Sequence, residues 1–232
     1  VYAFLLPRLG FDGRRIQFWN LLLKLCNIPV YLFVFAVALV TNAQRAHLQG
    51  MGSVEEVAQE KGAIYQGLGS EGVAVVNADD AHADYWRELN AARRIVTFGI
   101  DRAADVRGRC TLRGLGSRLE LDTPEGAVEV ALQVPGLHNA RNAVAAAAAC
   151  LAAGVTFEAV AEGLAEFAGT RGRLQRRDGP HGALVLDDSY NANPDSVRAG
   201  IDVLASMPGH TWLVLGDMGE VGDTSAQVHD EI

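Results

Sequence analysis

The feature that most constrains the fold of this chain is an alternation of short apolar runs with segments of helical spacing. The apolar runs, rich in Val, Ile and Leu, are typical of buried strands. They comprise residues 35–40, 72–77, 94–99, 183–188 and 211–217. The helical segments between them comprise residues 53–68, 85–92, 138–153, 156–167 and 193–205. Strands that alternate with helices predict an α/β fold with a mostly parallel sheet flanked by helices.

Capping residues mark the starts of several predicted helices. Ser53 is followed three residues later by Glu56, which is the spacing of a capping box. Thr156 and Asn193 occupy N-cap positions, and Pro194 suits the first helical position after Asn193. We therefore expect these helices to begin next to those residues.

Residues 109–134 break the alternation and predict an antiparallel addition to the sheet. The segments "SRLELD" and "AVEVALQV" alternate in polarity, and the turn "TPEG" joins them. Farther along, residues 169–172 are rich in Gly and Arg and predict a linker. The roughly sixty residues after it hold only two predicted strands and two predicted helices, too few for an independent core. We expect this second unit to be incomplete or to depend on the first.

Charge and cysteine content narrow the class of protein. The formal net charge is −8 and the chain has three cysteines, Cys26, Cys110 and Cys150, with no CxxC pair. An acidic chain is a poor candidate for nucleic-acid binding, so no nucleic-acid partner is expected. Widely spaced cysteines of odd number argue against a disulfide framework and favour the cytoplasm. The short cluster at Arg176 and Arg177 is interpreted as a solvated linker.

The first residues of the chain have a different character. Residues 25–40 lack charge, but they are fewer than the ~20 needed to span a bilayer, and Pro29 interrupts them. No small-residue cleavage site follows, as a signal peptide would require. A buried strand at residues 35–40 is the preferred interpretation, and membrane association through this segment is the alternative.

Polar residues crowd the junction between the predicted strand 183–188 and the helix that follows it. Asp187 and Asp188 end the strand and point to opposite faces, so they are not expected to act as a pair. Tyr190, Asn191 and Asn193 come next. A carboxylate at such a strand end can bind a ribose hydroxyl or a metal-bound phosphate. A helix cap with a turn is the structural alternative.

A second candidate site lies at the start of the alanine-rich helix. His138, Asn139 and Asn142 occupy its first turn, where free backbone N–H groups and the helix dipole favour electron-rich ligands. An amide side chain can present a donor and an acceptor to a base edge. An Asn cap with an incidental His is the alternative.

Two further residues are candidates because of their surroundings. Lys61 stands on the apolar stripe of its helix, where a lysine either reaches the rim or serves a site. His47 lies in a glycine-containing loop after the first strand and could contact a metal or phosphate. A surface histidine is the alternative.

Six segments occur together in an order that resembles the Mur ligases. They are "TNAQRAHLQGMGSVEEVAQEKGAI", "VVNADD", "VPGLHNARNAVAAAAA", "GRLQ", "DDSYNANPDSVRAGIDVLA" and "VLGDMGEVG". Within that family the MurF type is the most similar. The resemblance implies three parts: an unassigned apolar leader at 1–35, a partial central ATP-binding domain at 36–170, and a partial Rossmann-like C-terminal domain at 171–232.

The resemblance also implies an activity. Members of this type use ATP and Mg²⁺ to join D-alanyl-D-alanine to UDP-N-acetylmuramoyl-tripeptide through an acyl phosphate, in peptidoglycan precursor synthesis. By similarity, the nucleotide would contact six residues: His138, Asn139, Asn142, Arg173, Asp188 and Asn191. His47 and Lys61 would be catalytic and would bind metal, Lys61 as a carbamate.

One family motif is absent from these residues. The phosphate loop has the form G-x-x-x-x-G-K-[ST], and the only lysines here, Lys24 and Lys61, lack its glycines. We therefore expect this chain by itself to bind ATP weakly and to be inactive as a ligase. The alternative is a non-catalytic nucleotide-binding or membrane-associated interaction protein.

Overall fold

A six-stranded mixed sheet forms the larger unit of the computed structural model, which describes residues 35–44, 53–218, 229–230 and 232. The strands lie in the order in which they occur along the chain. They are β1 (Phe35–Val40), β2 (Leu68–Asn77), β3 (Arg94–Gly99), β4 (Val106–Arg113), β5 (Gly116–Thr123) and β6 (Gly126–Leu132). The first four are mutually parallel, and β5 and β6 are antiparallel to their neighbours. The predicted mostly parallel α/β sheet is confirmed.

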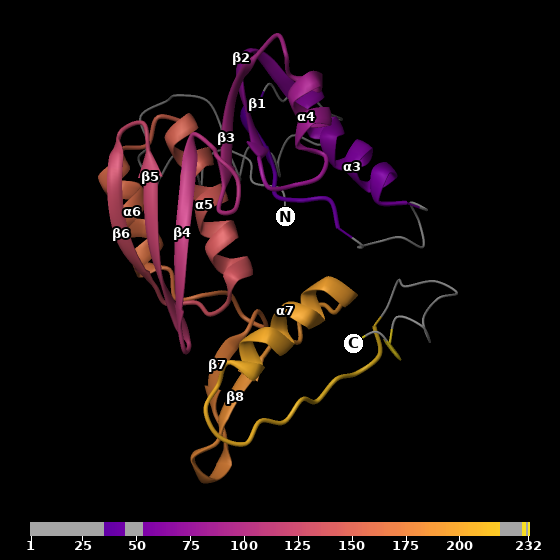
Figure 1. Ribbon diagram of the computed structural model, residues 1–232, viewed down its shortest axis with the longest axis vertical. Coiled ribbons are helices and arrows are strands. Elements are labelled where there is room, and N and C mark those ends of the chain that lie inside the picture. The colour runs from indigo at the N-terminus through magenta and orange to yellow at the C-terminus, as the bar shows by residue number, and fades with distance from the viewer. Residues whose placement is uncertain (1–34, 45–52, 219–228, 231) are drawn as a thin grey trace, which may run out of the picture.

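Helices cover both faces of this sheet (Figure 1). Helices α5 (Leu137–Ala152) and α6 (Phe157–Glu166) pack on one face. Helices α3 (Val54–Gly62) and α4 (Ala83–Leu89), with the short 3₁₀ helix η1 (Ala63–Gly67), pack on the other. Both faces of the parallel part are therefore buried, as parallel sheets require.

The alternation of side chains along β2 separates the two cores. Val73 and Val75 belong to the core beneath α5 and α6. Ala74 and Val76 belong to the core beneath α3 and α4. Because side chains of a strand point alternately to opposite faces, one continuous apolar run supplies both cores.

The second unit is a small layer below the larger sheet (Figure 1). It contains the antiparallel pair β7 (Gln175–Asp178) and β8 (Leu184–Asp187), the turn η2 (Pro180–Gly182) between them, and helix α7 (Pro194–Ala205). Asn193 caps α7 by accepting a hydrogen bond from the Ser196 N–H (2.9 Å), and Pro194 is the first helical residue. The predicted start of this helix is confirmed.

Other predicted starts are confirmed with small changes of length. The Ser53 and Thr156 hydroxyls accept hydrogen bonds from the third residue of α3 and α6. The helix predicted over 53–68 ends at Gly62, passes through η1, and gives way to β2 at Leu68. The predicted strands at 35–40 and 94–99 have the bounds of β1 and β3.

Three predictions need correction. Residues 176 and 177 belong to β7, not to a linker, because they pair with β8. The antiparallel part has a third strand, β4, before the predicted hairpin. Residues 211–217 form no strand: the segment pairs with no strand among the residues that the structure describes, and Trp212 and Val214 are 87% and 96% exposed.

Candidate functional site

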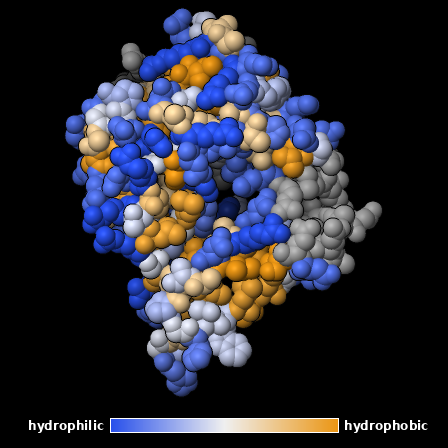
Figure 2. Space-filling view, in the orientation of Figure 1, coloured by the Kyte–Doolittle hydropathy of each residue, from blue (hydrophilic) through white to orange (hydrophobic). Residues whose placement is uncertain are grey.

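The start of α5 lies against the second unit (Figure 1). We call this contact, between residues 136–138 and α7, the seam. Gly136 precedes α5 with φ +90°, a conformation that favours glycine. An ideal Cβ on Gly136 would lie 2.9 Å from Cγ2 of Val203, which belongs to α7. The glycine therefore lets α7 approach the first turn of α5. Figure 2 shows a hollow between the two units, bordered mainly by hydrophilic residues.

His138 and Asp188 lie near enough to one another for the charge of each to affect the pKa of the other. Burial lowers the pKa of His138, and the Asp188 carboxylate opposes that change. Asp188 is open to solvent on one side, yet its neighbours exclude enough water to raise the pKa of its carboxyl group. The backbone N–H of Leu174 donates to Asp188 Oδ1 (3.1 Å) and opposes that rise.

Arg173 lies on the linker side of the same seam. Its guanidinium carbon stands 4.1 Å from the centre of the Tyr190 ring, a cation–π contact. The Tyr190 N–H donates to the Gly172 carbonyl (3.1 Å), which brings the linker against the end of β8. Arg173 and Tyr190 are both exposed, so this stacked pair borders solvent.

The two aspartates have different hydrogen-bond partners, and their separate roles stay a prediction. Asp187 accepts hydrogen bonds from the Ser189 N–H and hydroxyl and forms an ion pair with Arg177. The hydrogen bonds from Ser189 are the largest cause that lowers the pKa of Asp187. Asp187 therefore links β8 to β7 through Arg177, whereas Asp188 Oδ2 lies 3.5 Å from an ideal Cβ on Gly200 of α7.

The three predicted asparagines have different surroundings. Asn139 is half-buried, and its Nδ2 donates to the Pro135 carbonyl (2.7 Å), which ties the first turn of α5 to the preceding loop. Asn142 is exposed. Asn191 is exposed too, and its Oδ1 accepts from the Ala192 N–H (2.9 Å). Contact of these side chains with a nucleotide stays a prediction.

Lys61 lies apart from the seam, beside the carboxyl end of β1. Its Nζ donates to the Asn42 carbonyl (2.9 Å), and the side chain is half-buried. Burial lowers the pKa of Lys61, whereas the nearby Asp80 carboxylate favours the charged form. The amine is therefore held at the sheet edge, and a catalytic or metal-binding role for Lys61 stays a prediction. His47 lies outside the described residues.

Polar side chains at the ends of β2 and β3 were not predicted as site residues. Asp79 accepts hydrogen bonds from the N–H groups of three consecutive residues after β3. One of these, Asp101, forms an ion pair with Arg141 of α5 (2.8 Å). The side chains of Asn77 and Asp80 are buried beside them. Their signal in the sequence was the motif "VVNADD", in which polar residues follow an apolar strand.

The end of β2 also borders a small recess. It is lined by Asn77, Asp79, Phe98, Gly99, Ile100, Arg141 and Val144. The described part of the chain holds no group of three or more His, Cys, Asp or Glu side chains arranged for a metal ion. Asp79 and Asp80 already accept backbone hydrogen bonds, so these described residues do not by themselves fit a magnesium site.

The fold is that of an α/β protein whose second, smaller unit lies against the start of α5. A family model described as the Mur ligase middle domain matches residues 28–150, and one described as the Mur ligase glutamate ligase domain matches residues 172–232. The chain belongs to the Mur ligase family, whose members are ATP-dependent peptide ligases.

Similar relatives within the family include ligases of the MurF type. UDP-N-acetylmuramoyl-tripeptide–D-alanyl-D-alanine ligase of Escherichia coli (strain K12) is 40% identical, over 84% of this chain and 44% of the relative. The enzyme of the same name from Haemophilus influenzae is 39% identical, over 84% of this chain and 42% of the relative. The chain thus spans less than half the length of the curated relatives that it matches.

Solved structures agree with this assignment. A crystal structure of MurF from Acinetobacter baumannii superposes with a TM-score of 0.80 at 36% identity, over 84% of this chain and 43% of that chain. The MurF ligase from Thermotoga maritima in complex with ADP superposes with a TM-score of 0.71 at 26% identity, over 84% of this chain and 44% of that chain. The family that the sequence motifs predicted is confirmed, and these relatives and solved structures are of the MurF type.

Proposed function

We propose that this chain is part of a MurF-type ligase that joins D-alanyl-D-alanine to UDP-N-acetylmuramoyl-tripeptide in peptidoglycan precursor synthesis. The name of the relative from Escherichia coli, 40% identical over most of this chain, supports the choice of substrates. ATP, when bound, supplies the phosphoryl group that activates the carboxylate of the tripeptide. We propose ATP as the nucleotide because a MurF neighbour binds ADP.

The observation that carries the proposal is the close approach of the second unit to the first turn of α5. It brings Val203 of α7 against Gly136 and places Asp188 near enough to His138 for their charges to interact. Free N–H groups at a helix start favour electron-rich ligands, and a carboxylate at a strand end suits ribose hydroxyls. A purine nucleotide in the hollow would meet both groups.

Individual roles follow from these positions. Asn139 and Asn142 would contact adenine with His138 beside them, and Asn191 would border the base. Arg173 and Asp188 would hold the nucleotide from the linker side. The exposed guanidinium of Arg173, already stacked on Tyr190, is ordered for such a contact. The linker near residues 169–172 would divide a central domain at 36–170 from a C-terminal domain at 171–232.

Lys61 and His47 would act in the transfer step. The half-buried amine of Lys61 has a lowered pKa, which favours the neutral form that reacts with CO₂ to give a carbamate. A carbamate would supply oxygen ligands for Mg²⁺, with His47 as a further ligand. The cytoplasm is the expected location, because Cys110 and Cys150 are free thiols.

We further propose that the 232 residues alone do not ligate. The phosphate-loop motif is missing from them, so the backbone N–H cradle that it would supply is missing as well. The described residues include no helix long and apolar enough to cross a membrane.

Titration of the purified chain with a non-hydrolysable ATP analogue tests the proposal. Asp188→Ala should weaken binding about tenfold or more, the loss expected for a hydrogen bond to a charged group. Asp178→Ala is the matched control, because Asp178 pairs with Leu184 at the opposite end of the β7–β8 hairpin. Equal affinity of the two variants would refute the nucleotide site, and ligation at a normal rate would refute the predicted inactivity.

A further inference from the structure

The short segment that follows β1 is held by side chains instead of by a strand. Residues 41–43, the β1 tail, follow the last residue of β1, Val40, which pairs with Val76 of β2. One backbone group from each of these three residues then forms a hydrogen bond with a side chain. These are Asn77 Nδ2 to the Thr41 carbonyl (2.7 Å), Lys61 Nζ to the Asn42 carbonyl (2.9 Å), and the Ala43 N–H to Asp80 Oδ2 (2.8 Å).

Two of these side chains are buried and use both of their polar atoms. Asn77 is 8% exposed, and its Oδ1 accepts from the Asp79 N–H (2.9 Å). Asp80 is 9% exposed, and its Oδ1 accepts from the His82 N–H (2.8 Å). Each side chain therefore links the β1 tail to the loop after β2. Loss of either would leave buried backbone groups without a partner.

The tail needs these contacts because β1 stands at the end of the described sheet. Its one ladder partner there is β2, and that ladder ends with Val40. Beyond that point the position of the Asn42 carbonyl depends on the neighbouring contacts of Thr41 and Ala43. That carbonyl is the acceptor that holds the Lys61 amine.

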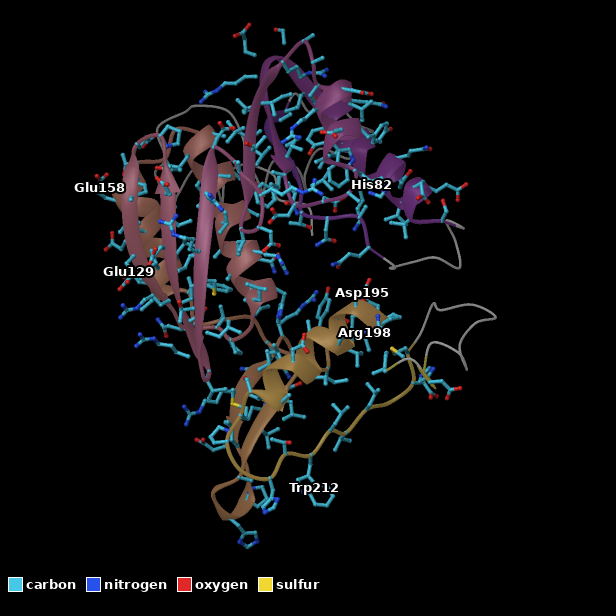
Figure 3. The ribbon with its side chains drawn as sticks, in the orientation of Figure 1. His82, Glu129, Glu158, Asp195, Arg198 and Trp212 are labelled. Carbon is cyan, nitrogen blue, oxygen red and sulfur yellow. The ribbon has the colours of Figure 1, made fainter. Side chains whose placement is uncertain are left out.

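We propose that Asn77 and Asp80 are positioning residues that hold the β1 tail so that the Asn42 carbonyl fixes the amine of Lys61 at the sheet edge. The purpose of that amine rests on the proposed function, but its placement does not. His82 sits beside this network, and Figure 3 shows it on the side of the sheet where α3 and α4 lie. The network adds Asn77, the last residue of β2, to the surroundings of Lys61.

The chain offers a direct readout, because Lys24 and Lys61 are its only lysines. A brief pulse of a water-soluble acetylating ester at fixed pH, followed by peptide mass spectrometry, gives the acetylation rate of Lys61 by itself. Asn77→Ala leaves the charge unchanged and removes the contact with Thr41. We expect the Lys61 rate to rise about fivefold, the factor that corresponds to about 1 kcal/mol for one hydrogen bond.

Asn90→Ala is the matched control. Asn90 is also a buried asparagine, 0% exposed, and its Nδ2 donates to the Trp86 carbonyl (2.8 Å), away from the β1 tail. It should destabilise the fold to a similar degree and leave the Lys61 rate within about twofold of the parent chain. Alkylation of Cys150, which packs against the core beneath α5, reports general opening in every variant.

Asp80→Asn is the second variant, to be used alongside Asn77→Ala. Its single amide oxygen can accept from the Ala43 N–H or the His82 N–H but not both, and it also removes the carboxylate that favours the charged form of Lys61. Its Lys61 rate should therefore rise at least as much as that of Asn77→Ala, without faster alkylation of Cys150. An unchanged Lys61 rate in a folded Asn77→Ala chain would overturn the proposal, and so would an equal rise in Asn90→Ala. Since the assay contains no nucleotide, failure of the proposed ATP site would leave its result unaltered.

Discussion

Substitution of Gly136 by alanine should destabilise the chain because two separate costs meet at this residue. Its backbone has φ +90° and ψ 147°, a combination that residues with a side chain rarely adopt. An added Cβ would lie 2.7 Å from His138 Cε1 and 2.9 Å from Val203 Cγ2. Gly136→Ala would therefore strain the backbone and push α7 away from the start of α5.

The size of the effect follows from these two costs. Backbone strain of this kind costs about 1–3 kcal/mol. Overpacking against a methyl group that belongs to another helix costs about 1–3 kcal/mol more. The sum is about 2–6 kcal/mol, a large fraction of the free energy of unfolding of an ordinary domain.

Urea denaturation followed by circular dichroism measures this change, and Gly163→Ala is the control. Gly163 lies inside α6, and an added Cβ there would meet nothing within 4 Å. Alanine should stabilise that helix by about 0.5–1 kcal/mol. If Gly136→Ala stayed within about 0.5 kcal/mol of the parent chain, the close approach of α7 to α5 would be refuted. The seam that supports the proposed nucleotide site would then be in doubt.

Two further predictions concern the burial of Trp86 and of His138. Trp86 is fully buried and donates its Nε1–H to the Ala58 carbonyl, whereas Trp212 is 87% exposed and points away from α7 in Figure 3. In urea denaturation, Trp86→Ala should cost about 3–5 kcal/mol and Trp212→Ala less than about 0.5 kcal/mol; similar costs would contradict the burial described. The lowered pKa of His138 means that the unfolded chain binds its proton at higher pH than the folded chain. Stability should therefore rise with pH through the window from the folded pKa up to about 6.5. His138→Gln should flatten that rise in urea midpoints measured across the window, and an unchanged slope would count against burial of the imidazole.

Features that depend on residues close together in sequence were predictable. Strands β1 and β3 have the predicted bounds because apolar runs and flanking polar residues are local signals. The caps at Ser53, Thr156 and Asn193 followed from the same logic, since each side chain bonds the backbone only three residues away. The family type was readable because its motifs are short and occur in a fixed order.

Features that depend on residues far apart in the sequence were not predictable. Residues 211–217 have the composition of a strand but form none, because a strand exists only where another strand pairs with it. Conversely, the charged residues of β7 form a strand because β8 lies beside them. Composition does not reveal which neighbours are present.

The amino-acid sequence by itself determined the α/β class, the helix starts and the membership of the family. Only the tertiary structure decided that Asp188 comes near enough to His138 for their charges to interact, and that Asn77 and Asp80 hold the tail of β1. The physical reason is the separation along the chain over which each kind of signal acts. Apolar periodicity and capping act within a few residues, whereas these contacts join groups more than thirty residues apart, which only the folded sheet brings together.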